Sequence, residues 1–234
     1  MIGCVIFAAG KGKRMKSAKA KVLHSLMGKP MLEYVLEATS FCEKRVVVVG
    51  CQADKVAGLI GKKAEIVIQK EQLGTADALI SALPSVENLS DILVLPADVP
   101  LIKRETLESL INAHKKKNPL CTILSVRKKN PTGYGRIIIE DRVRIVEEKD
   151  AKPLEKKENL VNTGIYCFKT QGLSEKLKKI GRKNKQQEYY LTDVIEMFEK
   201  ERVLVIEHEN EMEVSGINDR YELSKTEELL RKGD

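Results

Sequence analysis

The sequence opens with MIGCVIFAAGKGKRM (residues 1–15), an apolar run followed directly by a glycine-rich basic loop. The run Cys4 to Ala8 is almost continuously apolar, as expected for a strand buried on both faces of a sheet. In the loop, glycines permit a sharp turn that presents backbone N–H groups to an anion, and lysine and arginine side chains add positive charge. The loop matches neither a Walker A motif nor a dinucleotide fingerprint. We interpret it as a phosphate-binding loop, with an ordinary basic surface turn as the alternative.

Short apolar runs continue along the chain and alternate with amphipathic segments. In Thr75 to Leu83, for example, apolar residues recur on one helical face. This alternation predicts an α/β fold with a mixed, mostly parallel central sheet flanked by helices on both faces. A polar turn between the runs at 136–140 and 143–147 predicts a hairpin, and residues 218–232 are predicted to form a closing helix. The other strands are predicted at residues 45–49, 65–68, 92–95, 121–126, 161–168 and 203–206.

The composition narrows the class of protein. The formal net charge is +7, which fits phosphorylated substrates, nucleic acid, an anionic membrane or a solvated Lys/Glu-rich surface. Aromatic residues make up only 4% and are not interleaved with the basic clusters, which argues against a nucleic-acid-binding module. The sequence has no apolar run that could cross a bilayer and no signal peptide, so neither membrane association nor secretion is expected.

The cysteines have no zinc-ligand spacing. We expect them to be reduced thiols in a cytoplasmic protein. They are Cys4, Cys42, Cys51, Cys121 and Cys167.

Polar residues follow two of the predicted strands. Asp98 comes just after the run Ile92 to Leu95, and a carboxylate at the carboxyl end of a buried strand is a natural magnesium ligand. In Gln69 to Ala76, glutamine amides and a glycine-exposed backbone could recognise the edge of a base. Each segment also has an ordinary interpretation, a helix cap for the first and a polar strand-to-helix loop for the second.

Ten motifs occur in one order: AAGKGKRM (8–15), KVLH (21–24), GKPM (28–31), QLGTA (72–76), ADVPL (97–101), PTGYGRI (131–137), EEKDA (147–151), NTGIY (162–166), QEYYLTD (187–193) and GINDR (216–220). In them the sequence resembles the uridyltransferase domain of bacterial N-acetylglucosamine-1-phosphate uridyltransferases, over essentially its whole length. The resemblance implies a Rossmann-like nucleotide-diphospho-sugar transferase fold as a single domain over residues 1–234. Its nucleotide-binding part would be about 1–115, its sugar-binding part with the hairpin about 116–217, and its closing helix 218–234.

The resemblance also implies roles for individual residues. The catalytic residues would be Arg14, Lys21 and Asp98, and Mg²⁺ would bind to Asp98 and Asn218. The sugar would contact Gly135, Glu147, Asn162 and Asn218. The nucleotide would be held by Phe7, Ala8, Ala9, Gly10, Lys21, Gln69, Gln72, Gly74, Thr75, Pro96, Ala97 and Asp98.

The sequence departs from the family pattern in three places. Ala97 stands where the family usually has Gly and is expected to crowd the nucleotide slightly, and Ala20 stands where it usually has Pro. The bifunctional enzymes continue into a left-handed β-helix that acetylates glucosamine-1-phosphate, whereas this sequence stops at Asp234. We therefore expect no acetyltransferase activity, and a monomer, because that domain normally builds a trimer.

The implied reaction joins UTP and N-acetylglucosamine-1-phosphate to give UDP-N-acetylglucosamine and pyrophosphate, by magnesium-assisted in-line attack. A phosphate nucleophile is already ionised at neutral pH, so no general base is required. His24, His114 and His208 accordingly lie outside any catalytic-looking cluster. The alternatives are the same chemistry with another sugar 1-phosphate, such as glucose-1-phosphate or mannose-1-phosphate, or with another nucleotide, and a catalytically silent binder.

Overall fold

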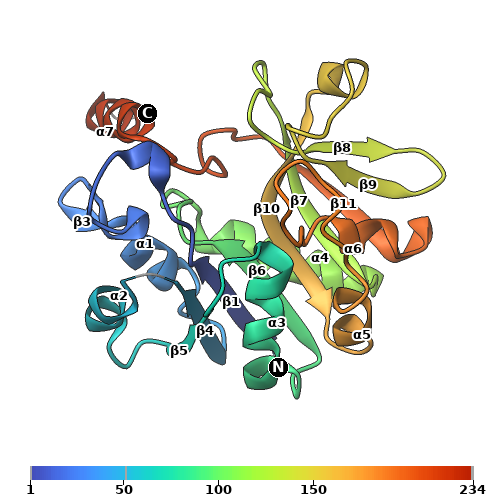
Figure 1. The fold of residues 1–234 in the computed structure, drawn as a ribbon, viewed down its shortest axis with the longest axis horizontal. Coiled ribbons are helices and arrows are strands. Elements are labelled where there is room, and N and C mark those ends of the chain that lie inside the picture. The colour runs from blue at the N-terminus through green and yellow to red at the C-terminus, as the bar shows by residue number, and fades with distance from the viewer. Residues whose placement is uncertain (1, 51, 233–234) are drawn as a thin grey trace.

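The computed structural model describes residues 2–50 and 52–232, in which helices cover both faces of one large sheet (Figure 1). Among the described residues the sheet has nine strands, and its main path runs β11-β7-β10-β6-β1-β4-β5. Neighbouring strands from β6 to β5 are parallel, as are β7 and β11, whereas β10 is antiparallel to both β6 and β7. The prediction of a mixed, mostly parallel sheet is confirmed. The strands on this path are β1 (Ile2–Ala8), β4 (Lys44–Val49), β5 (Glu65–Ile68), β6 (Asp91–Pro96), β7 (Cys121–Arg127), β10 (Leu160–Lys169) and β11 (Val203–His208).

Helices pack on both faces because the central strands are apolar on both sides. In β1, Cys4 and Ile6 belong to one buried cluster, while Val5 between them belongs to the other. The first cluster is covered by α1 (Met31–Ala38), α2 (Ala53–Ile60) and α4 (Arg104–Lys117). The second is covered by α3 (Thr75–Val86), α5 (Leu173–Leu177) and α6 (Asp193–Glu196).

The predicted hairpin is β8 (Arg136–Ile139) and β9 (Val143–Val146), which pair antiparallel. Arg136 of β8 also pairs with Val161 of β10, so the hairpin extends from the main sheet (Figure 1). The remaining short elements are β2 (Ser25–Leu26), β3 (Lys29–Pro30) and the 3-10 turns η1 (Lys13–Met15), η2 (Lys21–Leu23), η3 (Glu155–Lys157) and η4 (Lys200–Arg202).

The predicted closing helix is α7 (Arg220–Lys232), which begins two residues later than the expected Asn218. Hydrogen bonds to side chains at its N-terminus explain why the helix begins at this position. Asp219 accepts a 2.8 Å hydrogen bond from the backbone N–H of Glu222, and the carboxylate of Glu222 accepts a 2.6 Å bond from the N–H of Asn218. This arrangement resembles a capping box and leaves the side chain of Asn218 outside the helix.

Cysteines Cys4, Cys42, Cys121 and Cys167 are buried free thiols, as predicted, and Cys51 lies outside the described residues. Within residues 2–50 and 52–232, none of the helices combines the length and the apolar character that crossing a membrane requires.

Candidate functional site

Two adjacent cavities lie near the carboxyl ends of the neighbouring strands β1 and β6. In the sheet, Phe7 of β1 pairs with Pro96 of β6, and the N–H of Ala97 donates a 3.0 Å hydrogen bond to the carbonyl of Phe7. The smaller cavity, about 270 Å³, is lined by the glycine-rich loop together with Lys21, Asp98 and Asn218. The larger one, about 510 Å³, shares Phe7, Gly10 and Lys13 with it. The carboxyl ends of parallel strands are where α/β sheets bind ligands.

In the smaller cavity, Lys21, Asp98 and Asn218 form one cluster. The ammonium of Lys21 contacts Oδ2 of Asp98 and lies 2.7 Å from Oδ1 of Asn218. The N–H of Ile217 donates a 2.8 Å bond to the carbonyl of Asp98, which holds the segment before α7 against the end of β6. The three residues predicted to bind phosphate or metal are therefore brought together from distant parts of the chain.

The oxygen atoms of this cluster fit a magnesium ion that is shared with a substrate. Mg²⁺ is usually held by one or two protein oxygens, with phosphates and waters completing the shell. Oδ2 of Asp98 and Oδ1 of Asn218 converge on a single cation, the Lys21 ammonium. In the described part of the chain, no three or more His, Cys, Asp or Glu side chains gather as a metal site. The cluster therefore presents two protein oxygens that could bind Mg²⁺, rather than a complete cage.

The glycine-rich loop turns tightly against Lys21. Gly12 has a φ of 56°, and a Cβ at this position would lie 2.8 Å from Cβ of Lys21. Only glycine combines that backbone conformation with so close an approach. The loop thus carries Lys13 and Arg14 to the wall of the smaller cavity, next to Lys21. This concentration of positive charge suits a polyphosphate.

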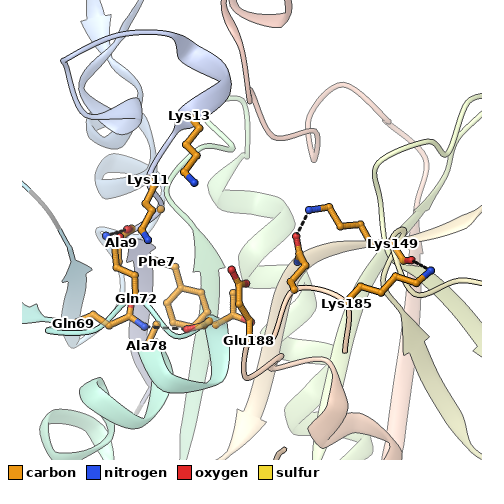
Figure 2. A pocket seen from close by; sticks show the side chains of 14 residues that line it. Phe7, Ala9, Lys11, Lys13, Gln69, Gln72, Ala78, Lys149, Lys185 and Glu188 are labelled. Carbon is orange, nitrogen blue, oxygen red and sulfur yellow. Dashed lines mark hydrogen bonds between the residues drawn. The ribbon is translucent and has the colours of Figure 1, made fainter. Parts of the chain in front are cut away.

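The larger cavity contains the residues predicted for the base (Figure 2). Buried Gln69 donates hydrogen bonds from Nε2 to the carbonyl of Gly74, at 3.0 Å, and to Asp77, at 2.6 Å, so its amide is held in one orientation. Gln72 donates to the carbonyl of Ala9, which links this segment to the glycine-rich loop. Gly74 has a φ of 125°, and a Cβ there would lie 2.5 Å from the carbonyl oxygen of Tyr189.

Three of the four residues predicted for the sugar, Gly135, Glu147 and Asn162, also lie together. The N–H of Asn162 donates a 2.9 Å bond to the carbonyl of Gly135, and a Cβ on Gly135 would lie 3.4 Å from the carboxylate of Glu147. Burial is the main cause that raises the pKa of Glu147, and the hydroxyl of Thr192 opposes it with a 3.1 Å hydrogen bond. Asn218, also predicted for the sugar, lies in the smaller cavity beside Lys21.

Sequence reasoning missed the wall of the larger cavity that faces the glycine-rich loop. Figure 2 shows Lys11 and Lys13 on one side and Lys149 and Lys185 on the other. Lys149 donates a 2.6 Å bond to the side chain of Gln186, and Lys185 donates one of 2.6 Å to the carbonyl of Lys149. Lys149 stands in the motif EEKDA, which could have drawn attention to it, but Lys185 belongs to none of the ten motifs.

Comparison with known proteins identifies the family of the chain. Residues 4–213 match the family described as nucleotidyl transferase. The chain belongs to the nucleotidyl transferase family. This match confirms the broader family to which the resemblance seen in the motifs belongs.

Among the relatives of this nucleotidyl transferase are proteins named bifunctional protein GlmU. The one from Pelotomaculum thermopropionicum is 44% identical and is aligned over 99% of this chain and 52% of its own length. The one from Thermosipho africanus is 41% identical, over 97% of this chain and 50% of its own length. The chain thus spans about half the length of these curated relatives. A solved structure of UDP-glucose pyrophosphorylase with UDP-glucose covers the whole chain with a TM-score of 0.79 at 18% identity, which shows a common fold.

Proposed function

We propose that this chain transfers UMP from UTP to N-acetylglucosamine-1-phosphate, giving UDP-N-acetylglucosamine and pyrophosphate. The observation that carries the proposal is the convergence of Lys21, Asp98 and Asn218 beside a basic glycine-rich loop. The choice of sugar and base is supported by the 41–44% identity to proteins named GlmU and by the partly buried polar side chains of Glu147 and Asn162.

The reaction would be an in-line displacement at the α-phosphorus. An oxygen of the sugar phosphate forms the new P–O bond, the bond to the β-phosphate breaks, and pyrophosphate leaves with the electron pair. Arg14 and Lys21 would hold the phosphates and neutralise their growing charge. Mg²⁺, held by Asp98 and Asn218, would supply further charge neutralisation and orient the phosphates. The attacking phosphate is already anionic, so no side chain has to remove a proton.

Gln69, Gln72, Gly74 and Thr75 would bind the uracil side, while Phe7, Ala8, Ala9 and Gly10 would line the rest of the nucleotide. Pro96 and Ala97, also predicted for the nucleotide, line neither cavity, and Ala97 is fully buried. In the sugar pocket, the Glu147 carboxylate would accept hydrogen bonds from sugar hydroxyls. Asn162 would present an amide to the acetamido group, since one amide offers the donor and the acceptor that another amide requires. We assign residues of about 1–115 to nucleotide binding and about 116–217 to the sugar. Of the predicted closing segment 218–234, Arg220–Lys232 form the helix, and residues 233–234 lie outside the described residues. A cytoplasmic location, a monomer and the absence of nucleic-acid partners stay predictions.

The test is pyrophosphate release from UTP, with and without Mg²⁺, beside three sugar phosphates. We expect magnesium-dependent release with N-acetylglucosamine-1-phosphate, and little with glucose-1-phosphate or glucosamine-1-phosphate. Release with glucose-1-phosphate alone would keep the chemistry but overturn the sugar. No release with any sugar or nucleotide would overturn the proposal.

A further inference from the structure

We propose that Lys21 occupies the divalent-metal site in the free protein and competes there with the metal, and that a nucleotide relieves this competition by receiving the Lys21 ammonium group. The inference rests on the proposed function, because it concerns the order in which that same site takes its ligands. Its basis is that the Lys21 ammonium contacts Oδ2 of Asp98 and Oδ1 of Asn218 at once. These are the two protein atoms that suit Mg²⁺.

A lysine and a metal ion cannot share these two oxygens in this arrangement. Mg²⁺ binds oxygen at about 2.0–2.1 Å and demands near-octahedral geometry. The ammonium of Lys21 already lies 2.7 Å from Oδ1 of Asn218 and in contact with Asp98, so an ion on the same atoms would lie against it. Two cations at such a distance repel strongly, particularly where solvent is limited. Binding of the metal therefore requires Lys21 to move.

The surroundings decide where Lys21 can go. The side chains of Lys21 and Asp98 are only 12% and 21% exposed, so their attraction is partly shielded from water and salt. Among the described residues that line the smaller cavity, Asp98 is the only carboxylate, while Lys13 and Arg14 are cations. A displaced Lys21 therefore meets like charges and no alternative protein anion in this cavity.

A nucleotide changes this balance, because its phosphates bring negative charge into the same cavity. The four-carbon stem of a lysine is flexible enough to turn its ammonium from one anion to another. With phosphates present, Lys21 can bind them and leave Asp98 and Asn218 to the metal. Metal and nucleotide should thus bind with positive coupling, and by linkage each should strengthen the other equally.

The experiment measures binding of free Mn²⁺ by electron paramagnetic resonance, in the absence of any nucleotide or sugar. The variants are Lys21→Met, which keeps the length of the side chain, and Lys21→Gln, which keeps polarity. Lys13→Met is the matched control, because it removes the same charge from the same cavity but has no contact with Asp98 or Asn218 in the structure. Asp98→Ala in the Lys21→Met background verifies the position of the ion.

We expect both Lys21 variants to bind Mn²⁺ about tenfold more tightly than the wild type, a size typical of coupled sites. Lys13→Met should change the affinity by less than about twofold, since exposed charges are well screened, and Asp98→Ala should abolish the gain. Equal effects of the Lys21 and Lys13 variants, or a gain that survives Asp98→Ala, would overturn the inference. Because no substrate is present, this result is independent of whether the chain transfers UMP.

Discussion

The hydroxyl of Thr192 donates a 3.1 Å hydrogen bond to Oε1 of Glu147, two residues separated by 45 positions in the sequence. Thr192 is buried at the start of α6, and Glu147 directly follows β9. Burial and the nearby carboxylates of Asp193 and Asp150 raise the pKa of Glu147, so this hydrogen bond favours the ionised form against its surroundings. In the proposed reaction, the ionised form is the one that accepts hydrogen bonds from the sugar.

Thr192→Val should therefore weaken sugar binding by raising the pKa of Glu147 further. We expect kcat/KM for N-acetylglucosamine-1-phosphate to fall about tenfold, the size of one hydrogen bond to a charged group, with KM for UTP unchanged. The acid side of the pH profile of kcat/KM should move to higher pH, since more of the carboxyl is protonated at a given pH. Thr192→Ser, which keeps the hydroxyl, should behave as the wild type. An unshifted acid side would contradict this role of Thr192.

Tyr166 should orient Asn162 in the same pocket. Nδ2 of Asn162 donates a 2.6 Å bond to the Tyr166 hydroxyl, and Oδ1 accepts a 3.1 Å bond from the N–H of Gly164. Because one bond needs the amide nitrogen and the other needs the amide oxygen, together they fix the orientation of the Asn162 side-chain amide. Tyr166→Phe removes one of them, and we expect KM for the sugar phosphate to rise about fivefold, the loss of one neutral hydrogen bond, with kcat nearly constant. Steady-state kinetics with the sugar phosphate varied would measure this, and an equal fall in kcat would argue for a general structural defect.

Asp98→Ala should remove most turnover without unfolding the protein. Loss of one group that stabilises charge in the transition state commonly costs about 10²–10³ in rate, and Lys21→Ala is expected to act similarly. Pyrophosphate release gives the rate, and far-ultraviolet circular dichroism verifies the fold. Near-normal turnover of both variants in Mg²⁺ would contradict the assigned site.

Gly74→Ala should destabilise the fold and also disturb the part of the larger cavity that is predicted to bind the base. At a φ of 125°, the added methyl group would collide with the backbone of Tyr189. We expect the free energy of unfolding to fall by at least about 2 kcal/mol, as for other strained substitutions, and KM for UTP to rise. Gly58→Ala in α2 is the control, because a Cβ there meets nothing within 4 Å and alanine favours helices. Urea unfolding of the two variants should give changes of opposite sign.

Asp193 should make stability depend on pH. Burial and the carboxylates of Glu196 and Asp150 raise its pKa from 3.8 to about 6. The folded state therefore binds this proton more tightly than the unfolded state, and stability falls as the pH rises through that range. Asp193→Asn should raise the free energy of unfolding at neutral pH by about 1 kcal/mol, after allowance for partial exposure. Near pH 3.5 the gain should vanish, and an equal gain at both pH values would contradict the assignment.

The sequence alone was enough for the fold class and for most strands, because strand and helix patterns are local properties of the chain. The apolar runs at 65–68 and 121–126 correspond to β5 and β7, and the periodic segment at 75–83 became α3. The candidate residues Lys21, Asp98 and Asn218 were likewise found from motifs, each of which is short and contiguous.

Only the tertiary structure decided which side chains meet. Lys21 and Asn218 are 197 positions apart, and their contact depends on the order of the strands and on how the segment before α7 is held against β6. The bond of Thr192 to Glu147 and the wall formed by Lys149 and Lys185 arise in the same way. Local patterns specify each element, because they follow from backbone geometry and the burial of one face. Contacts between elements depend on packing in three dimensions, which no single stretch of sequence contains.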